Sequence, residues 1–126
     1  MLTAARLTAF AATTQPDLAR AFYGETLGLR LITEDDFALL FDANGTDLRV
    51  QKVRTVQPSG YTALGWQVPD IRATVVGLRE LGVAFERYPY FEQDTDGIWD
   101  APGGARVAWF KDPDGNLLSV VTVPTS

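Results

Sequence analysis

The sequence contains neither cysteine nor histidine in its 126 residues. Without cysteine there is no disulfide, no thiol nucleophile and no thiolate ligand, and without histidine there is no imidazole acid–base catalyst. Zinc sites built on nitrogen or sulfur ligands are therefore excluded. Any bound metal would need oxygen ligands alone, which favours a hard cation such as magnesium, manganese or calcium.

Long hydrophobic runs and an excess of positive charge are also lacking. No apolar run approaches the roughly 20 residues needed to span a bilayer, and residues 1–6 lack the basic-then-apolar order of a signal peptide. The net charge of -5 disfavours nucleic acid and anionic membrane surfaces as partners. With 46% apolar and 21% charged residues, we expect a cytoplasmic protein that folds as a single globular domain over residues 1–126.

The order of the predicted elements repeats. The first half, about residues 5–54, predicts strands at 7–13, 29–33, 37–41 and 48–53, with one helix between the first two. That helix opens at Pro16-Asp17 and ends at Gly28, and its predicted apolar face comprises Leu18, Ala21, Phe22 and Leu27.

The second half, about residues 61–124, comes after a linker at 55–60 and predicts strands at 61–68, 83–87, 105–110 and 117–123. A short strand around 98–99 is a further expectation. The helix of this half runs from Pro69-Asp70 to Gly82, and its predicted apolar face comprises Ile71, Val75, Leu78 and Leu81.

The two halves also share residues at corresponding places. Pro16-Asp17 recurs as Pro69-Asp70, and Leu27-Gly28 recurs as Leu81-Gly82. The turn at 42–45, which carries an Asn-Gly hairpin signal, recurs as the turn at 112–115. We therefore predict an α+β fold built from two βαβββ modules.

Three motifs in this order resemble the vicinal oxygen chelate superfamily, which includes glyoxalase I, bleomycin resistance proteins, fosfomycin resistance enzymes and extradiol dioxygenases. The motifs are Phe22-Tyr23 followed by Leu27-Gly28-Leu29, Val68-Pro69-Asp70-Ile71 running into Leu81-Gly82-Val83, and the stretch from Phe110 to Leu118. The resemblance implies paired modules whose curved mixed sheets enclose a cavity. It also implies a homodimer.

The resemblance further implies four side chains that hold a divalent metal. The corresponding positions here hold Ala9, Arg49, Ala63 and Ser119. An alanine methyl has no lone pair to donate and an arginine repels a cation, so these positions do not form a metal site of useful strength. We expect no metal and no other cofactor, and metal-assisted chemistry has no support from these residues.

Strand alternation predicts which side chains point into the cavity. They are Ala9, Arg49, Gln51, Ala63, Gly65, Gln67, Ser119 and Val121. Pairing across the turn at 112–115 sets Ala108 opposite Ser119, which adds Arg106, Ala108 and Phe110 to that face. Strand alternation turns Trp66 and Trp109 to the opposite face, toward the helices. Arg49 or Arg106 would then bind an anionic ligand. In the alternative, Arg49 reaches solvent or pairs with Asp47 or with an acidic residue of a partner chain.

The segment 88–99 concentrates aromatic and acidic residues. In one interpretation Tyr90, Phe91 and Trp99 wall the cavity and Glu92 or Asp94 acts as a base or polar anchor. In the other, the aromatic residues pack at a dimer interface and the acids are solvated. The acids at 92, 94 and 96 alternate as calcium ligands do, but the rest of that pattern is lacking.

The leading hypothesis is a metal-free small-molecule binding protein, similar to the bleomycin resistance proteins, that sequesters an anionic or aromatic ligand. Its candidate binding residues are Arg49, Gln51, Gly65, Gln67, Tyr90, Phe91, Trp99, Arg106, Ala108 and Ser119. One alternative is a metalloenzyme of glyoxalase or dioxygenase type with oxygen ligands displaced to Gln51, Glu92, Asp94 or Asp96. The other is a non-catalytic dimeric interaction protein, and the sequence leaves open whether any reaction is catalysed.

Overall fold

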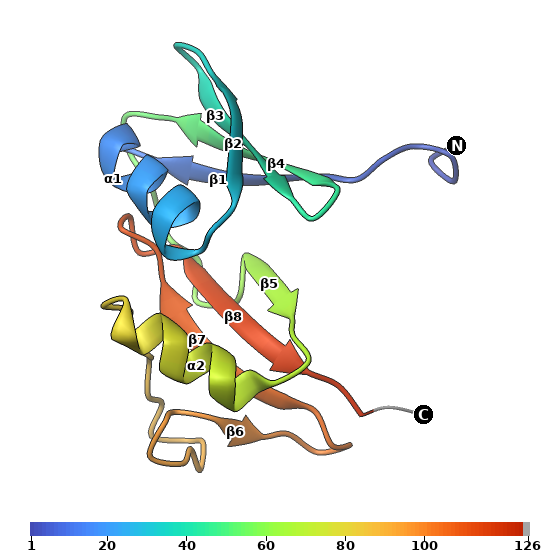
Figure 1. Cartoon of the computed structure of the whole chain (residues 1–126), viewed down its shortest axis with the longest axis vertical. Helices are drawn as coiled ribbons and strands as arrows, with labels where there is room; N and C mark the ends of the chain where they lie inside the picture. Colours follow the sequence, from blue (N-terminus) through green and yellow to red (C-terminus); the bar gives the residue numbers. More distant parts are fainter. Residues whose placement is uncertain (125–126) are drawn as a thin grey trace. The chain divides into compact units, whose positions relative to one another are not determined.

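The computed structural model describes residues 1–124, which form two compact units that join in sequence at Pro58 and Ser59. Each unit has a helical segment and a four-stranded sheet (Figure 1). The elements of unit 1 are β1 (Thr8–Thr13), α1 (Pro16–Arg20), the π-helix η1 (Ala21–Thr26), β2 (Arg30–Glu34), β3 (Ala38–Ala43) and β4 (Thr46–Lys52). Those of unit 2 are β5 (Leu64–Gln67), α2 (Ile71–Glu80), β6 (Trp99–Asp100), β7 (Arg106–Lys111) and β8 (Leu117–Thr122).

The two sheets have the same topology. Their strand orders are β1-β4-β3-β2 and β5-β8-β7-β6. In each sheet the first strand pairs in parallel with the last, and the other neighbours are antiparallel. This confirms the predicted α+β fold of two βαβββ modules with mixed sheets.

The helical segment of unit 1 covers one side of its sheet. The Tyr23 ring is fully buried, and its centroid lies 5.8 Å from that of Phe41. Ala19, one helical turn earlier, is buried as well. Leu18, predicted on the buried face, is instead 52% exposed. The buried stripe of this segment therefore runs through Ala19 and Tyr23, spaced four residues apart, and Leu18 points away from it.

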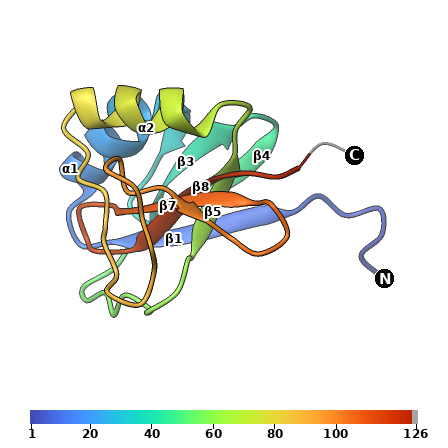
Figure 2. The ribbon, with the colours of Figure 1, turned by 90° about the horizontal axis from the view of Figure 1, so that it is seen from below.

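Helix α2 forms a layer on one side of the sheet of unit 2 (Figure 2). It begins where the Asp70 carboxylate accepts a hydrogen bond from the backbone N–H of Ala73 at 3.0 Å, which satisfies a donor of the first turn. Ile71 and Val75 are buried as predicted. Leu81 lies beyond the last helical residue and is exposed. The helix side of the sheet is formed by the buried residues Ala108, Phe110, Leu118 and Val120.

The strand predicted at 83–87 is wrong. Only an isolated bridge forms there, between Phe85 and Phe110, and the backbone N–H of Glu86 donates to the Trp109 carbonyl at 2.7 Å. The two-residue strand β6 takes the remaining part of the β7 edge, opposite Arg106 and Val107. Two short segments thus share one sheet edge, and this sharing leaves residues 83–87 too little of the edge for a strand of the predicted length.

The register of the closing hairpin corrects a second prediction. The last paired residues are Lys111 and Leu117, and the backbone N–H of Asp112 donates to the Asn116 carbonyl at 3.0 Å. The loop thus holds three residues and ends at Gly115, whose φ of 86° is typical of this loop class. Trp109 therefore lies opposite Ser119, and Ala108 lies opposite Val120. The prediction that Ala108 faces Ser119 was wrong, because a one-residue change in register moves every side chain to the other face.

Among residues 1–124, no helix is long and apolar enough to cross a membrane.

Candidate functional site

The side of the unit 2 sheet that faces away from α2 is called here the open face. Gly65 pairs with Ser119 and Gln67 with Val121 across β5 and β8, so the structure places these predicted site residues on one face. Gly65 and Gln67 are exposed. A Cβ atom at residue 65 would lie 3.0 Å from the Ser119 hydroxyl oxygen, so the glycine keeps the space beside that hydroxyl open.

Five aromatic residues gather at the β6–β7 edge of the open face and are called here the aromatic cluster: Tyr88, Tyr90, Phe91, Trp99 and Trp109. The Phe91 ring lies 4.2 Å from the Trp99 ring at 28°, and 5.2 Å from the Trp109 ring at 4°. Tyr88 meets Trp109 edge-on at 5.4 Å. Because Trp99 lies opposite Val107, it shares the open face with Trp109.

Two members of the cluster were not predicted as site residues from the sequence. Trp109 was predicted on the helix side, and the signal that places it correctly is the glycine that ends a three-residue loop in the closing hairpin. Tyr88 was not singled out, although it stands two residues before Tyr90 and stacks on it at 5.5 Å. Partial burial and the nearby Glu86 carboxylate raise the pKa of Tyr88, so its hydroxyl stays protonated at neutral pH.

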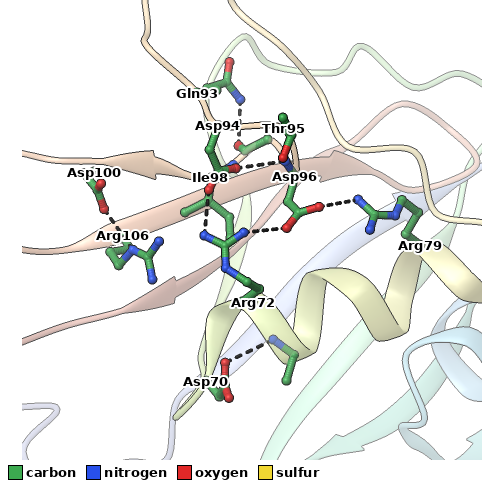
Figure 3. A network of polar contacts seen from close by, with 12 residues as sticks. Asp70, Arg72, Arg79, Gln93, Asp94, Thr95, Asp96, Ile98, Asp100 and Arg106 are labelled. Carbon is green, nitrogen blue, oxygen red and sulfur yellow. Dashed lines mark hydrogen bonds and ion pairs between the residues drawn. The ribbon is translucent and has the colours of Figure 1, made fainter.

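The acidic residues of the 88–99 segment hold the segment itself. The Asp94 carboxylate accepts hydrogen bonds from the backbone N–H groups of Asp96 and Ile98 at 2.9 and 3.0 Å, and from Arg72 of α2 at 2.7 Å. Asp96 pairs with Arg72 and with Arg79, the latter at 2.7 Å (Figure 3). We call these four charged residues the clamp.

The clamp keeps both carboxylates ionised. Partial burial alone would raise the pKa of Asp94, but the bonds from Arg72 and the two backbone N–H groups outweigh it and lower that pKa. The guanidinium of Arg79, followed by that of Arg72, lowers the pKa of Asp96. A carboxylate with a lowered pKa and all its partners in place is a poor general base. Asp94 and Asp96 therefore fit a structural role, whereas Glu92 is exposed.

The turn that contains Asp94 repeats the turn of the closing hairpin. In Asp94–Ile98, as in Asp112–Asn116, the first carboxylate accepts from the backbone N–H groups two and four residues later. The glycine before the last residue has a positive φ in both, 88° at Gly97 and 86° at Gly115. The first of these turns closes a small hairpin in which Gln93 faces Trp99. The turn thereby fixes the position of Trp99 at the sheet edge.

Two predicted site residues lie off the open face. Ala108 is fully buried on the helix side, opposite Val120. Arg106 lies opposite Asp100 and Thr122, and its Nε donates to the Asp100 carboxylate at 2.8 Å. The face predicted for both was wrong, because the three-residue loop shifts β7 by one residue relative to β8.

In unit 1, Arg49 and Gln51 lie on one face of β4, and Arg49 is opposite Phe10 of β1. The Arg49 side chain is half-buried and forms no hydrogen bond or ion pair with any residue in the range 1–124. Its charge acts on Asp35, whose pKa is lowered first by the backbone N–H groups of Phe37 and Ala38 and then by Arg49. Asp47, the suggested partner of Arg49, instead approaches Arg6 at 3.9 Å. Ala9 was predicted to share the face of Arg49, and this was wrong, because Ala9 lies opposite the buried Leu48.

The donor set does not fit a divalent metal ion. Ala9, Arg49, Ala63 and Ser119 offer one hydroxyl oxygen between them. Within the described residues, no three aspartates or glutamates come close enough together to hold a metal. Asp94 and Asp96, which the metalloenzyme alternative needs, are already bound by arginines and backbone N–H groups.

Comparison with known families decides the relationship. The profile of the Glyoxalase/Bleomycin resistance protein/Dioxygenase superfamily matches residues 6–120. The chain belongs to this superfamily. No curated protein is matched by the sequence.

Solved structures share the fold of this chain. A member from Sphaerobacter thermophilus DSM 20745 is 24% identical with a TM-score of 0.75, covering 97% of this chain and 99% of that one. The bleomycin resistance determinant encoded on the transposon Tn5 is 19% identical with a TM-score of 0.74, covering 95% and 98%. Lactoylglutathione lyase from Agrobacterium tumefaciens is 14% identical with a TM-score of 0.72, covering 94% and 93%. At these identities the likeness supports the fold alone.

Proposed function

We propose that this superfamily member binds a small aromatic or anionic molecule without the help of a metal and sequesters it. The observation that carries the proposal is the aromatic cluster on the open face of unit 2, where the Phe91 ring stacks parallel to Trp109 within 4° and on Trp99 at 28°. Such rings present flat apolar surface to a planar ligand, and each stacked pair contributes about 0.5–1.5 kcal/mol beyond the area it buries.

Small and polar residues beside the cluster suit a bound ligand. Gly65 leaves room, and Ser119 and Gln67 offer hydrogen-bonding groups on the same face. Tyr90 adds a ring that is 73% exposed. Together these residues combine apolar walls with a few polar groups, which is the usual composition of a small-molecule site.

We further propose a second, separate site in unit 1, where Arg49, with Gln51 beside it on β4, binds an anionic group. The support for Arg49 is that it is half-buried and lacks an ion-pair partner among residues 1–124. A guanidinium can hold a carboxylate or sulfonate through two parallel hydrogen bonds. Arg106 is the weaker candidate, because its guanidinium already binds Asp100.

The chain carries its own matched control for the test. Its three tryptophans are Trp66, Trp99 and Trp109, and Trp66 lies on the helix side, opposite Val120. A series of planar aromatic carboxylates and sulfonates would be screened by thermal shift and then measured by calorimetry. We expect Trp99→Leu or Trp109→Leu to weaken binding about tenfold, the loss of roughly 1.4 kcal/mol of stacking. Trp66→Phe should leave the affinity unchanged.

Arg49 is tested separately with a carboxylate ligand and its methyl ester. Arg49→Gln should weaken binding of the carboxylate and leave binding of the ester unchanged, because only the acid can pair with a guanidinium. Equal effects on both ligands would remove the assigned role of Arg49. A screen in which no aromatic anion raises the melting temperature would contradict the proposed function as a whole.

A further inference from the structure

The segment 88–99 divides into a fixed part and a lightly held part. The fixed part is the hairpin 93–99, which is closed by the Asp94 turn and bound to α2 through the clamp. The other part, Pro89–Glu92, is called here the flap. In the described chain the flap is held by one backbone hydrogen bond, from Phe91 N–H to the Tyr88 carbonyl at 3.1 Å, and by contacts of its rings.

Gln93 fixes both ends of the flap. Its side-chain carbonyl oxygen accepts from the backbone N–H of Tyr88 at 2.7 Å, and its amide nitrogen donates to the carbonyls of Glu86 and Gly97 at 2.9 and 2.8 Å. These three bonds join the segment before the flap to the hairpin after it. Tyr88 and Gln93 are therefore held independently of the flap between them.

The ring of Phe91, which belongs to the flap, lies where a flat ligand would stack. Phe91 stacks 4.2 Å from Trp99 and parallel to Trp109 within 4°. Two indoles of the aromatic cluster are thus covered by a side chain of the protein itself. The flap bearing that side chain is otherwise exposed at Pro89, Tyr90 and Glu92.

We propose that Phe91 is a gate that imitates the ligand. A planar aromatic molecule binds by taking the place of the Phe91 ring on Trp99 and Trp109, and the flap lifts between Tyr88 and Gln93 to admit it. This inference rests on the proposed function and narrows the ligand to compounds with a flat aromatic ring. An aliphatic molecule of equal charge cannot replace the lost stacking and leaves the gate closed.

The gate predicts an unusual response to removal of a wall residue. Binding has to displace a stacked phenyl ring, so the apparent affinity is the intrinsic affinity reduced by the fraction of protein in which the gate is open. Removing the ring removes that cost. A residue that only lined the site would lose contacts on truncation and weaken binding instead.

The test compares naphthalene-2-sulfonate with cyclohexanesulfonate by calorimetry on the full chain. We expect Phe91→Ala to bind naphthalene-2-sulfonate about tenfold more tightly than the original protein, as for a gate open one-tenth of the time. Phe91→Leu, which keeps apolar bulk but no ring, should fall between the two. Cyclohexanesulfonate should bind weakly to all three.

Two results would overturn the gate, and they differ from a failure of the proposed function. If Phe91→Ala binds naphthalene-2-sulfonate more weakly while Trp99→Leu also weakens it, the site exists and Phe91 is a wall of it. If Phe91→Ala binds with unchanged affinity, the ring does not compete with the ligand. If neither the original protein nor Phe91→Ala binds any planar aromatic anion, the proposed function fails, and the proposed gate fails with it.

Movement of the flap is measured independently of affinity. Because the chain has no cysteine, Glu92→Cys on the flap and Thr95→Cys on the fixed hairpin can each carry a single spin label. Saturating naphthalene-2-sulfonate should increase the label's mobility at residue 92 and leave it unchanged at residue 95. An unchanged spectrum at residue 92 with bound ligand would contradict the proposal.

Discussion

The two units share one scaffold and differ in the connection between the helix and the edge strand. In unit 1 the helical segment leads through Gly28 directly into the five-residue edge strand β2. In unit 2 the edge strand β6 has two residues, and residues 81–98 precede it. That long connection supplies the flap, the acids of the clamp and most of the aromatic cluster. The candidate chemistry of unit 2 therefore lies in a segment added to the shared scaffold, which is a common way for a repeated fold to acquire a site.

Both units tie the helix to the sheet edge by arginine. In unit 1, Arg20 binds Glu34 of β2 through two hydrogen bonds of 2.8 Å each, and Lys52 approaches the same carboxylate at 2.8 Å. In unit 2, Arg72 and Arg79 bind acids of the hairpin 93–99. The same device thus fixes a strand in one unit and a loop in the other. In unit 2 the arginine pairs hold the hairpin 93–99, which adjoins the flap and carries Trp99.

The largest effect tests whether the two units are equivalent in their cores. Phe41 of β3 and Phe110 of β7 are both fully buried on the helix side of their sheets. Phe41→Ala and Phe110→Ala should each lower the free energy of unfolding by about 3–5 kcal/mol, because each leaves a cavity the size of a phenyl ring. Chemical denaturation followed by circular dichroism measures both losses.

Phe10, on the face of β1 shared with Arg49, provides the control because it is 54% exposed. Phe10→Ala should cost less than about 1 kcal/mol. A loss at Phe10 that equals the loss at Phe41 would show that the two sides of the unit 1 sheet have been assigned the wrong way round.

The sequence predicts the scaffold well because hydrophobic periodicity and turn residues are local signals. The Asn44-Gly45 turn, the Asp70 cap and the buried face of α2 depend on neighbouring residues, and the structure has each of them. Register is less local. One extra residue in the 112–116 loop turned Trp109 onto the open face and Ala108 into the core.

The clamp is invisible to the sequence for a related reason. It joins Arg72 to residues 22 and 24 positions later, and no periodic pattern records such a contact. The face to which each side chain of a strand points can be predicted correctly once the glycine identifies the class of the hairpin loop. The pairing of a helix with a loop requires the fold itself. The sequence therefore predicts Asp94 as a metal ligand or a base and Asp96 as a metal ligand, whereas the structure pairs both with arginines.

The second prediction tests whether the clamp fixes the loop of unit 2. Asp94→Ala removes the acceptor of two backbone N–H groups and one arginine, and should raise the amide exchange rate at Ile98 by about fivefold, the equivalent of roughly 1 kcal/mol. Arg72→Gln should have a smaller effect, because the hydrogen bonds that the Asp94 carboxylate accepts from the backbone N–H groups of Asp96 and Ile98 remain. Hydrogen exchange followed by NMR measures both, and Glu80→Gln on the exposed side of α2 is the control.

The pH dependence of this loop has a definite sign. The pKa values of Asp94 and Asp96 are lowered in the folded protein. The stabilisation of the loop by these two carboxylates is therefore complete above the ordinary carboxyl range near pH 4. It declines as the pH falls through the lowered values. Protection at Ile98 that is already lost at neutral pH would rule out the clamp as its cause.

The smallest expected effect is in unit 1, where a helix arginine binds an acid of an edge strand instead of a loop. It is measured by titration of that acid, Glu34. Hydrogen bonds from Arg20 and then Lys52 lower the pKa of Glu34 from 4.5 to about 2. Because the folded pKa is the lower one, Glu34 stabilises the fold fully above pH 4.5, and this contribution is lost as the pH falls toward 2. An NMR titration of the Glu34 carboxyl carbon should give a midpoint near 2, and Arg20→Gln should move it upward, since Arg20 is the larger cause. Arg30→Gln is the control, because Arg30 lies on the same strand but approaches Asp42, at 3.7 Å. A Glu34 midpoint above about 4, the ordinary carboxyl range, in the original protein would mean that arginine anchors the sheet edge in unit 2 alone.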